Sequence, residues 1–325
     1  MATINILEAI NQALEQKLAD DKRVVVFGED AGFEGGVFRA TAGLQKKFGE
    51  DRVFDTPIAE SAIIGSALGM SLNGLIPVAE IQFDGFLFPG FAELVSHVAR
   101  YRNRTRGAFS APLVIRVPVG GGIRALEHHS ESLETLLGHI PGLKVVTPST
   151  PYDAKGLLIS AIEDPDPVIF LEPKRIYRSG KQEVPSEMYR IPIGKAKVVK
   201  TGTDITVVAW GAMLREAEKA LKLLENDNVS VELIDLRTIS PIDEATIVES
   251  VKKTGRFLVV QEAVKSYGPG AELIAMINEK AFLHLEAPPA RVSGHDITVP
   301  LARAEQFHFV NPEQIRDQIL KVVRF

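Results

Sequence analysis

Continuous apolar segments alternate with segments of helical period along most of this chain, and this alternation constrains the fold more than any other feature. The apolar segments are 24–27, 76–83, 113–117, 143–146, 168–171, 205–210, 231–235, 257–260 and 290–292. The helical segments lie at 5–20, 59–73, 90–104, 152–163, 213–226, 242–252, 269–282 and 312–323. Strands that are apolar on both faces indicate a parallel sheet covered on both sides. We therefore predict an α/β protein with mostly parallel sheets and helices on both faces.

A polar segment with neither period, Ser179–Glu187, separates two such α/β parts. We predict a first domain at 1–180, a linker at 181–200 and a second domain at 201–325. The length of 325 residues fits this division, because domains commonly hold about 100–200 residues.

Composition excludes several classes of protein. The net charge of −5 argues against a nucleic-acid partner, which would require a basic surface. No apolar run approaches the ~20 residues of a membrane-spanning helix, and Met1–Asn5 does not begin a secretory signal. The chain has no cysteine, which excludes disulfides, thiolate metal sites and cysteine nucleophiles. We expect a cytoplasmic protein that binds no membrane.

Polar groups that directly follow the predicted strands are the candidate site residues, since ligands of open parallel sheets bind beyond the carboxyl ends of the strands. They are Glu29, Asp30, Glu60, Gln82, Asp84, Gly120–Gly122, His128 and His129.

Glu60 is the only charged residue between Asp55 and Asn73, at the start of a helix of small and apolar residues. Gly65 and Gly69 share one face of this helix and allow another backbone to approach closely. A carboxylate in such surroundings is poorly hydrated, which would raise its pKa toward values useful for proton transfer. The alternative is a first-turn acid that faces solvent and is favoured by the helix dipole. This segment alone favours the solvated alternative.

Three other motifs each allow two interpretations. The phenylalanines between 83 and 91 could stack on a planar heterocycle or form a small apolar cluster under a loop. Gly120–Gly122 lacks the lysine of a phosphate-binding loop and is interpreted as a flexible or tightly packed turn. One of His128 and His129 could act in acid–base chemistry, or the pair could simply precede a helix capped by Ser132.

Taken together, these segments resemble the β subunit of the 2-oxo acid dehydrogenase decarboxylases along essentially the whole chain. The matching motifs are Gly28–Asp30, Gly35–Arg39, Arg52–Glu60, Glu80–Phe83, His128–Ser130, Thr147–Leu158, Phe170–Lys174 and Asp235–Pro241. The resemblance implies a transketolase pyrimidine-binding domain followed by a transketolase C-terminal-like domain.

The resemblance also implies a cofactor and partners. Thiamine diphosphate would bind between this chain and a separate α subunit, within a heterotetramer of two α and two β subunits. In the family, the α subunit holds Mg²⁺ and the diphosphate through a Gly-Asp-Gly motif, which is absent here, so no Mg²⁺ ligands are expected in this chain. The chain would then be half of an active site, inactive alone, that works with a lipoyl acyltransferase core.

Three residues are implied to contact the cofactor. Glu60 matches the catalytic glutamate that hydrogen-bonds the aminopyrimidine ring and, when protonated, favours its imino tautomer. Gln82 is expected near the same ring. Phe86 matches an aromatic position, commonly tyrosine, that packs on the pyrimidine, and it keeps the stacking surface without the hydroxyl.

Two further sites follow from the same resemblance. His129 matches the catalytic histidine that assists transfer of the acyl group to a lipoyl dithiolane. A potassium ion, held by carbonyl groups at Ala161, Asp164 and Asp166, is implied by the branched-chain relatives.

The preferred 2-oxo acid is suggested by two segments that point in different directions. Residues 172–178 favour a branched-chain 2-oxo acid dehydrogenase, which is the leading expectation, whereas residues 131–134 favour a pyruvate dehydrogenase. A pyruvate or acetoin dehydrogenase β subunit is therefore the alternative within the lipoamide acyl-transferring class (EC 1.2.4). A non-catalytic α/β scaffold or regulatory subunit is the alternative from a different class.

Overall fold

Six strands of the first half and one short strand of the second form a seven-stranded sheet in the computed structural model, which describes all 325 residues. The strands in spatial order are β12 (Thr238–Ser240), β6 (Lys144–Val146), β7 (Val168–Pro173), β5 (Val114–Val119), β4 (Ile76–Glu80), β2 (Val24–Gly28) and β3 (Val53–Asp55). All neighbouring pairs are parallel except β12 with β6. The predicted mostly parallel sheet is confirmed.

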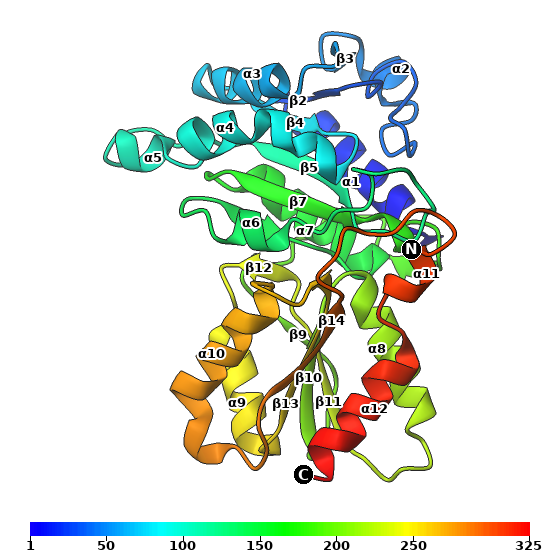
Figure 1. Cartoon of the computed structure of the whole chain (residues 1–325). Helices are drawn as coiled ribbons and strands as arrows, with labels where there is room; N and C mark the ends of the chain where they lie inside the picture. The colour runs from blue at the N-terminus through cyan, green and yellow to red at the C-terminus, as the bar shows by residue number, and fades with distance from the viewer.

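Helices cover both faces of this sheet (Figure 1). α1 (Ile6–Asp20) and α7 (Pro151–Glu163) pack against each other on one face, and α3 (Glu60–Leu72) lies on the other. A capping box fixes the start of α1, because the Asn5 side chain accepts from the Glu8 N–H at 2.9 Å while Glu8 accepts from the Asn5 N–H at 2.7 Å.

The helix predicted at 90–104 is broken into three pieces. α4 (Phe91–Glu93) leads into a wide π-type turn at Leu94–Val98, and α5 (Tyr101–Arg104) follows. The wide turn keeps Leu94 and Val98 both buried. The apolar face was recognised correctly from the sequence, but the change in helical period was not.

The second half forms a five-stranded sheet. Its strands in spatial order are β14 (Ala290–Gly294), β13 (Phe257–Val264), β10 (Ile205–Ala209), β11 (Val231–Asp235) and β9 (Lys197–Lys200), of which only β9 is antiparallel to its neighbour. α8 (Ala212–Leu223) and α12 (Pro312–Val323) cover one face, and α9 (Glu244–Thr254) and α10 (Pro269–Ala281) cover the other (Figure 1).

Short strands tie the two halves together. β8 (Gln182–Val184), inside the segment expected to be a linker, pairs antiparallel with β1 (Ala2–Ile4). β12 leaves the second half and pairs Thr238 with Val146 in the first sheet. The remaining short elements are α2 (Leu44–Phe48), η1 (Asp84–Gly90), α6 (Glu134–Gly138), η3 (Lys174–Ile176), η4 (Phe282–His284) and α11 (Glu305–His308). None of the helices combines the length and the apolar character needed to cross a membrane.

Candidate active site

The ends of β2, β3 and β4 meet at one edge of the first sheet. Gly28 lies in register with Asp55 of β3 on one side and with Glu80 of β4 on the other. The next two strands along the chain, β3 and β4, therefore lie on opposite sides of β2. Open parallel sheets bind ligands at such a switch point. Glu29, Glu60 and Gln82 all emerge beside this point.

Glu60 is buried at the first residue of α3, with 9 % of its surface exposed. The η1 segment packs directly on this helix start. The Ser61 hydroxyl donates to the Pro89 carbonyl at 2.7 Å, and a Cβ on Gly90 would lie 3.0 Å from the Glu60 carbonyl oxygen. Glu60 is therefore buried at the start of its helix and does not face solvent, so the solvated alternative does not describe its position.

Glu29 is a second buried acid at this edge; its place after a strand made it a candidate site residue, but the sequence suggested no specific role for it. Its Oε1 atom has no hydrogen-bond partner within the chain. Burial, with added repulsion from Glu60 and Asp30, raises the pKa of Glu29 to about 7. Its place directly after a buried strand was the available signal, but its nearness to Glu60 is a property of the fold.

Gln82 connects the ends of β4 and β2. Its Nε2 donates to the Asp30 carboxylate at 2.9 Å and approaches the Glu29 carbonyl at 3.4 Å. The amide thereby holds the backbone that carries Glu29. It is half-buried and retains an amide oxygen for a ligand.

An aromatic cluster brings the η1 segment to the histidine loop. The His129 ring lies edge-on to Phe83 and Phe86, with ring centroids 4.3 and 5.0 Å away. His129 Nδ1 is 2.8 Å from the Glu127 carbonyl oxygen. Since a carbonyl only accepts, Nδ1 carries a proton and Nε2 is left for chemistry. The structure thus joins Phe86 and His129, two of the predicted site residues.

A layer of buried ion pairs lies under this edge, and other acids near the site are paired with cations in it. Arg116 binds Glu172 at 2.7 and 3.0 Å and Glu80 at 2.6 Å. Lys174 binds Asp84 at 2.8 Å, and burial, opposed by Lys174, raises the pKa of Asp84 to about 6. Asp84 is therefore a structural residue, although it follows a strand as the site residues do.

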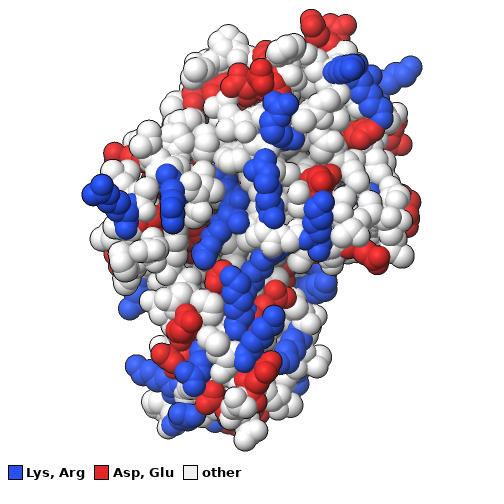
Figure 2. Space-filling view, turned by 90° about the vertical axis from the view of Figure 1, so that its right-hand side faces the viewer, with Lys and Arg blue, Asp and Glu red and all other residues white.

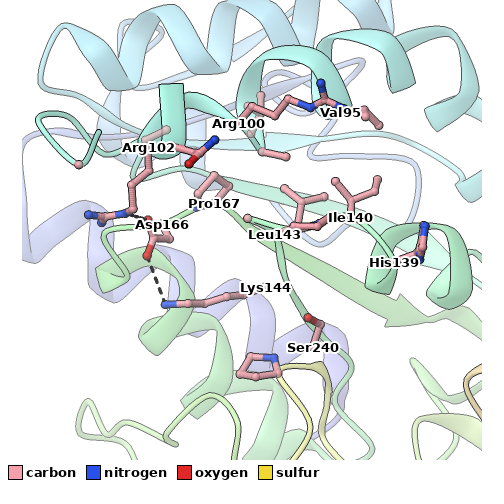
Figure 3. A pocket seen from close by; sticks show the side chains of 18 of the residues that line it. Val95, Arg100, Arg102, His139, Ile140, Leu143, Lys144, Asp166, Pro167 and Ser240 are labelled. Carbon is pink, nitrogen blue, oxygen red and sulfur yellow. Dashed lines mark hydrogen bonds and ion pairs between the residues drawn. The ribbon is translucent and has the colours of Figure 1, made fainter. Parts of the chain in front are cut away.

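The segment predicted to hold potassium lies at the opposite edge, where β6 and β7 begin. Lys144 binds the Asp164 carboxylate at 2.6 and 2.7 Å. Asp166 pairs with Arg102 and lies 3.8 Å from Lys144 (Figure 3). The Ala161 carbonyl accepts the Asp164 N–H at 3.3 Å. Arg102, Lys144 and Asp166 border a hollow of about 1060 Å³. Cationic side chains already neutralise both carboxylates, and no group of three or more His, Asp or Glu side chains is arranged to hold a metal.

Comparison with known families covers both halves of the chain. Residues 2–180 match the family described as "Transketolase, pyrimidine binding domain", and residues 194–315 match "Transketolase, C-terminal domain". A solved structure titled "Split gene transketolase, inactive beta4 tetramer" superposes with a TM-score of 0.81 at 24 % identity over 99 % of both chains, which supports the fold alone.

Curated proteins are similar over the full length. A protein of Acholeplasma laidlawii is 73 % identical, covering 100 % of this chain and 99 % of its own length. One of Bacillus subtilis (strain 168) is 52 % identical and is covered completely in both directions. Both carry the name "Pyruvate dehydrogenase E1 component subunit beta".

Proposed function

Because the chain belongs to the family of β subunits of thiamine-diphosphate-dependent 2-oxo acid dehydrogenases, we propose that it and a separate α subunit together catalyse the oxidative decarboxylation of pyruvate. The acyl group would pass to a lipoyl group of an acyltransferase core. The observation that carries this proposal is the pair Glu60 and Glu29, which are buried close together without a cation from this chain, whereas Asp84 and Glu172 are each paired with one.

The residues at this edge fit the aminopyrimidine half of the cofactor. Phe86 offers a ring face, Gln82 offers an amide, and Glu60 offers a carboxyl group for a ring nitrogen. The unpartnered Oε1 of Glu29 adds a buried polar atom that a ligand or a proton would satisfy. When bound, thiamine diphosphate supplies the carbon nucleophile and the electron sink for decarboxylation.

The acids hold and move a proton in this proposal. Burial and the nearby charge of Glu60 raise the pKa of Glu29 to about 7, so Glu29 is the acid that retains a proton near neutral pH. Glu60 would present its carboxyl group to the ring nitrogen. His129, oriented by its Nδ1–H···O bond to Glu127, would present Nε2 to the sulfur of the acyl acceptor.

The branched-chain preference that the sequence favoured is not supported, since both relatives described above are named for pyruvate. The segment 172–178 suggested that preference. In the structure, Glu172 and Tyr177 bind each other at 2.6 Å within the Arg116 network, and Lys174 is paired with Asp84. These side chains form ion pairs and hydrogen bonds in the core beneath the site, so this segment does not indicate the size of the substrate.

The surface around the site supports a partner subunit. Ile58, two residues before Glu60, is 83 % exposed, and Phe33 and Leu126 are also exposed. On α3, a Cβ at Gly65 or Gly69 would meet no atom of this chain within 4 Å, so this small-residue face is open. Exposed apolar side chains and an open small-residue helix face suit protein contacts. We assign them to the α subunit and the second β subunit of a heterotetramer.

The face that carries the site is also rich in cations. Figure 2 shows Lys and Arg side chains gathered down the middle of this face. Arg39, Arg124 and Arg178 are exposed, and Arg178 binds the Phe38 carbonyl at 3.0 Å. A positive surface attracts anions, and both a 2-oxo acid and a diphosphate are anions. Mg²⁺ bound by the α subunit and potassium at Ala161, Asp164 and Asp166 are proposals from the family resemblance, and a cytoplasmic location is a proposal from the composition.

Co-expression of this chain with its α subunit tests the proposal. We expect the complex, but not the chain alone, to decarboxylate pyruvate with kcat/KM at least about tenfold above that for branched 2-oxo acids. Faster turnover of branched acids would reverse the substrate assignment. A stable complex without any decarboxylation would favour the non-catalytic scaffold instead.

A further inference from the structure

Two carboxylates from the second half of the chain hold the backbone of the loop that leads to His129. Glu262 lies in β13, and Glu305, in α11, is only 4 % exposed. The hydrogen bonds run from Gly121 N–H to Glu262 Oε1 at 2.8 Å, from Gly122 N–H to Glu305 Oε1 at 2.7 Å, and from Arg124 N–H to Glu305 Oε2 at 3.1 Å. Hydrogen bonds to carboxylates are about twice as strong as neutral ones.

This contact explains the run of three glycines. Gly120 and Gly122 have φ values of 78° and 90°, in the left-handed region. A Cβ on Gly121 would lie 2.3 Å from the Phe309 ring, and one on Gly120 would lie 2.8 Å from the Glu262 carboxylate. Larger residues in this glycine run would prevent the Glu262 and Glu305 carboxylates from reaching the backbone N–H groups. Because the N–H groups of Gly121 and Gly122 are occupied, the run is a tightly packed turn and not a phosphate cradle.

The loop is fixed at its other end beside the site. The Gly85 N–H donates to the His128 carbonyl at 3.2 Å, and the Gly120 N–H donates to the Glu131 carbonyl at 2.8 Å. Between these anchors, residues 122–128 are almost entirely exposed to solvent. A loop with an exposed middle has little packing of its own, so its path depends on its anchors.

We propose that Glu305 and Glu262 are positioning residues, which set the path of the 120–129 loop and thereby the place of His129 in acyl transfer. The inference rests on the role proposed above for His129. The second half of the chain would then contribute to catalysis through the loop backbone, without touching the reacting groups. Misplacing a catalytic group by about 1 Å can lower a rate about a hundredfold.

Amide hydrogen exchange of the full chain tests the contact itself. In Glu305→Ala, we expect faster exchange at Gly122 and Arg124. Glu305→Gln should lie between wild type and Glu305→Ala, because its amide oxygen accepts one N–H while its NH₂ group faces the other. Glu313→Ala, an exposed change on the neighbouring α12, is the matched control and should leave this exchange unchanged. Wild-type exchange in Glu305→Ala would overturn the proposal.

Activity of the assembled enzyme tests the consequence. Acyl transfer to a free lipoyl domain should fall about tenfold to a hundredfold in Glu305→Ala, with partial recovery in Glu305→Gln. Decarboxylation of pyruvate, followed with ferricyanide as electron acceptor, should stay within about twofold of wild type. Equal losses in both reactions, or no loss of acyl transfer, would contradict a positioning role. A wild-type complex that does not decarboxylate pyruvate would instead refute the proposed function, while the exchange result would still stand.

Discussion

Replacement of Arg116 by methionine tests the ion layer that supports the site. Arg116 is 1 % exposed and is the only cation that hydrogen-bonds the buried carboxylates of Glu80 and Glu172. Burial raises the pKa of Glu80, and the guanidinium opposes this shift. Removing one partner of a buried ion pair costs about 3–5 kcal/mol, because the other partner is left charged in the core. We expect a loss of that size in the free energy of unfolding.

The loss should also depend on pH. In the variant, the guanidinium no longer opposes the effect of burial, so the folded-state pKa of Glu80 would lie well above the unfolded value of about 4.3. The folded state would then retain protons that the unfolded chain has released, so stability falls as pH rises. The slope is up to about 1.4 kcal/mol per pH unit for each uncompensated carboxyl group.

Denaturant unfolding of the full chain at about pH 6 and about pH 8 measures both effects. Arg23→Met is the matched control, because Arg23 pairs with Asp21 at the surface with its own side chain 63 % exposed, where such pairs contribute about 0–1 kcal/mol. The triple variant Glu80→Gln, Arg116→Met, Glu172→Gln should lose the added pH dependence. If Arg116→Met behaved like Arg23→Met at both pH values, the reasoning would be refuted.

Two further predictions concern single side chains. Burial raises the pKa of Glu134 from 4.5 to about 7. The free energy of unfolding of the wild type should therefore fall by up to about 3 kcal/mol as pH rises between these values, whereas that of Glu134→Gln, measured by denaturant unfolding, should not. Parallel stability curves for the two proteins between about pH 5 and about pH 8 would contradict this. Phe86→Ala in the assembled enzyme should raise the Kd for thiamine diphosphate about tenfold in calorimetric titrations, through lost stacking, whereas an unchanged Kd would show that Phe86 does not pack on the cofactor.

Local signals explain what the sequence predicted well. The start of α1 follows from the Asn5 and Glu8 capping pair, and β2 follows from a run of valines. Helix and strand order therefore agrees closely with the structure. The short strands β1 and β8 were missed because their pairing is not local: β1 pairs with β8, which lies in a segment that lacks any strand pattern.

The site was predictable only in part, for a related reason. The rule that ligands bind beyond strand ends selected Glu60, Gln82 and His129, together with Glu29 and Asp84. In the structure, Gln82 binds Asp30 after the end of β2, and the His129 ring packs on Phe83 and Phe86 after the end of β4. That rule does not identify which acids are paired with a cation in the folded chain. Asp84 and Glu172 are neutralised by Lys174 and Arg116, whose reach across neighbouring strands depends on register.

The most direct test of the account is Glu60→Gln in the complex with the α subunit. Glutamine keeps the size of the side chain but cannot hold the proton, so decarboxylation of pyruvate should fall about 10²–10⁴-fold while assembly stays intact. Glu50→Gln, an exposed change of the same kind, is the control. The account predicts an assembled, inactive Glu60→Gln complex beside an active Glu50→Gln complex. Undiminished turnover in assembled Glu60→Gln would contradict it.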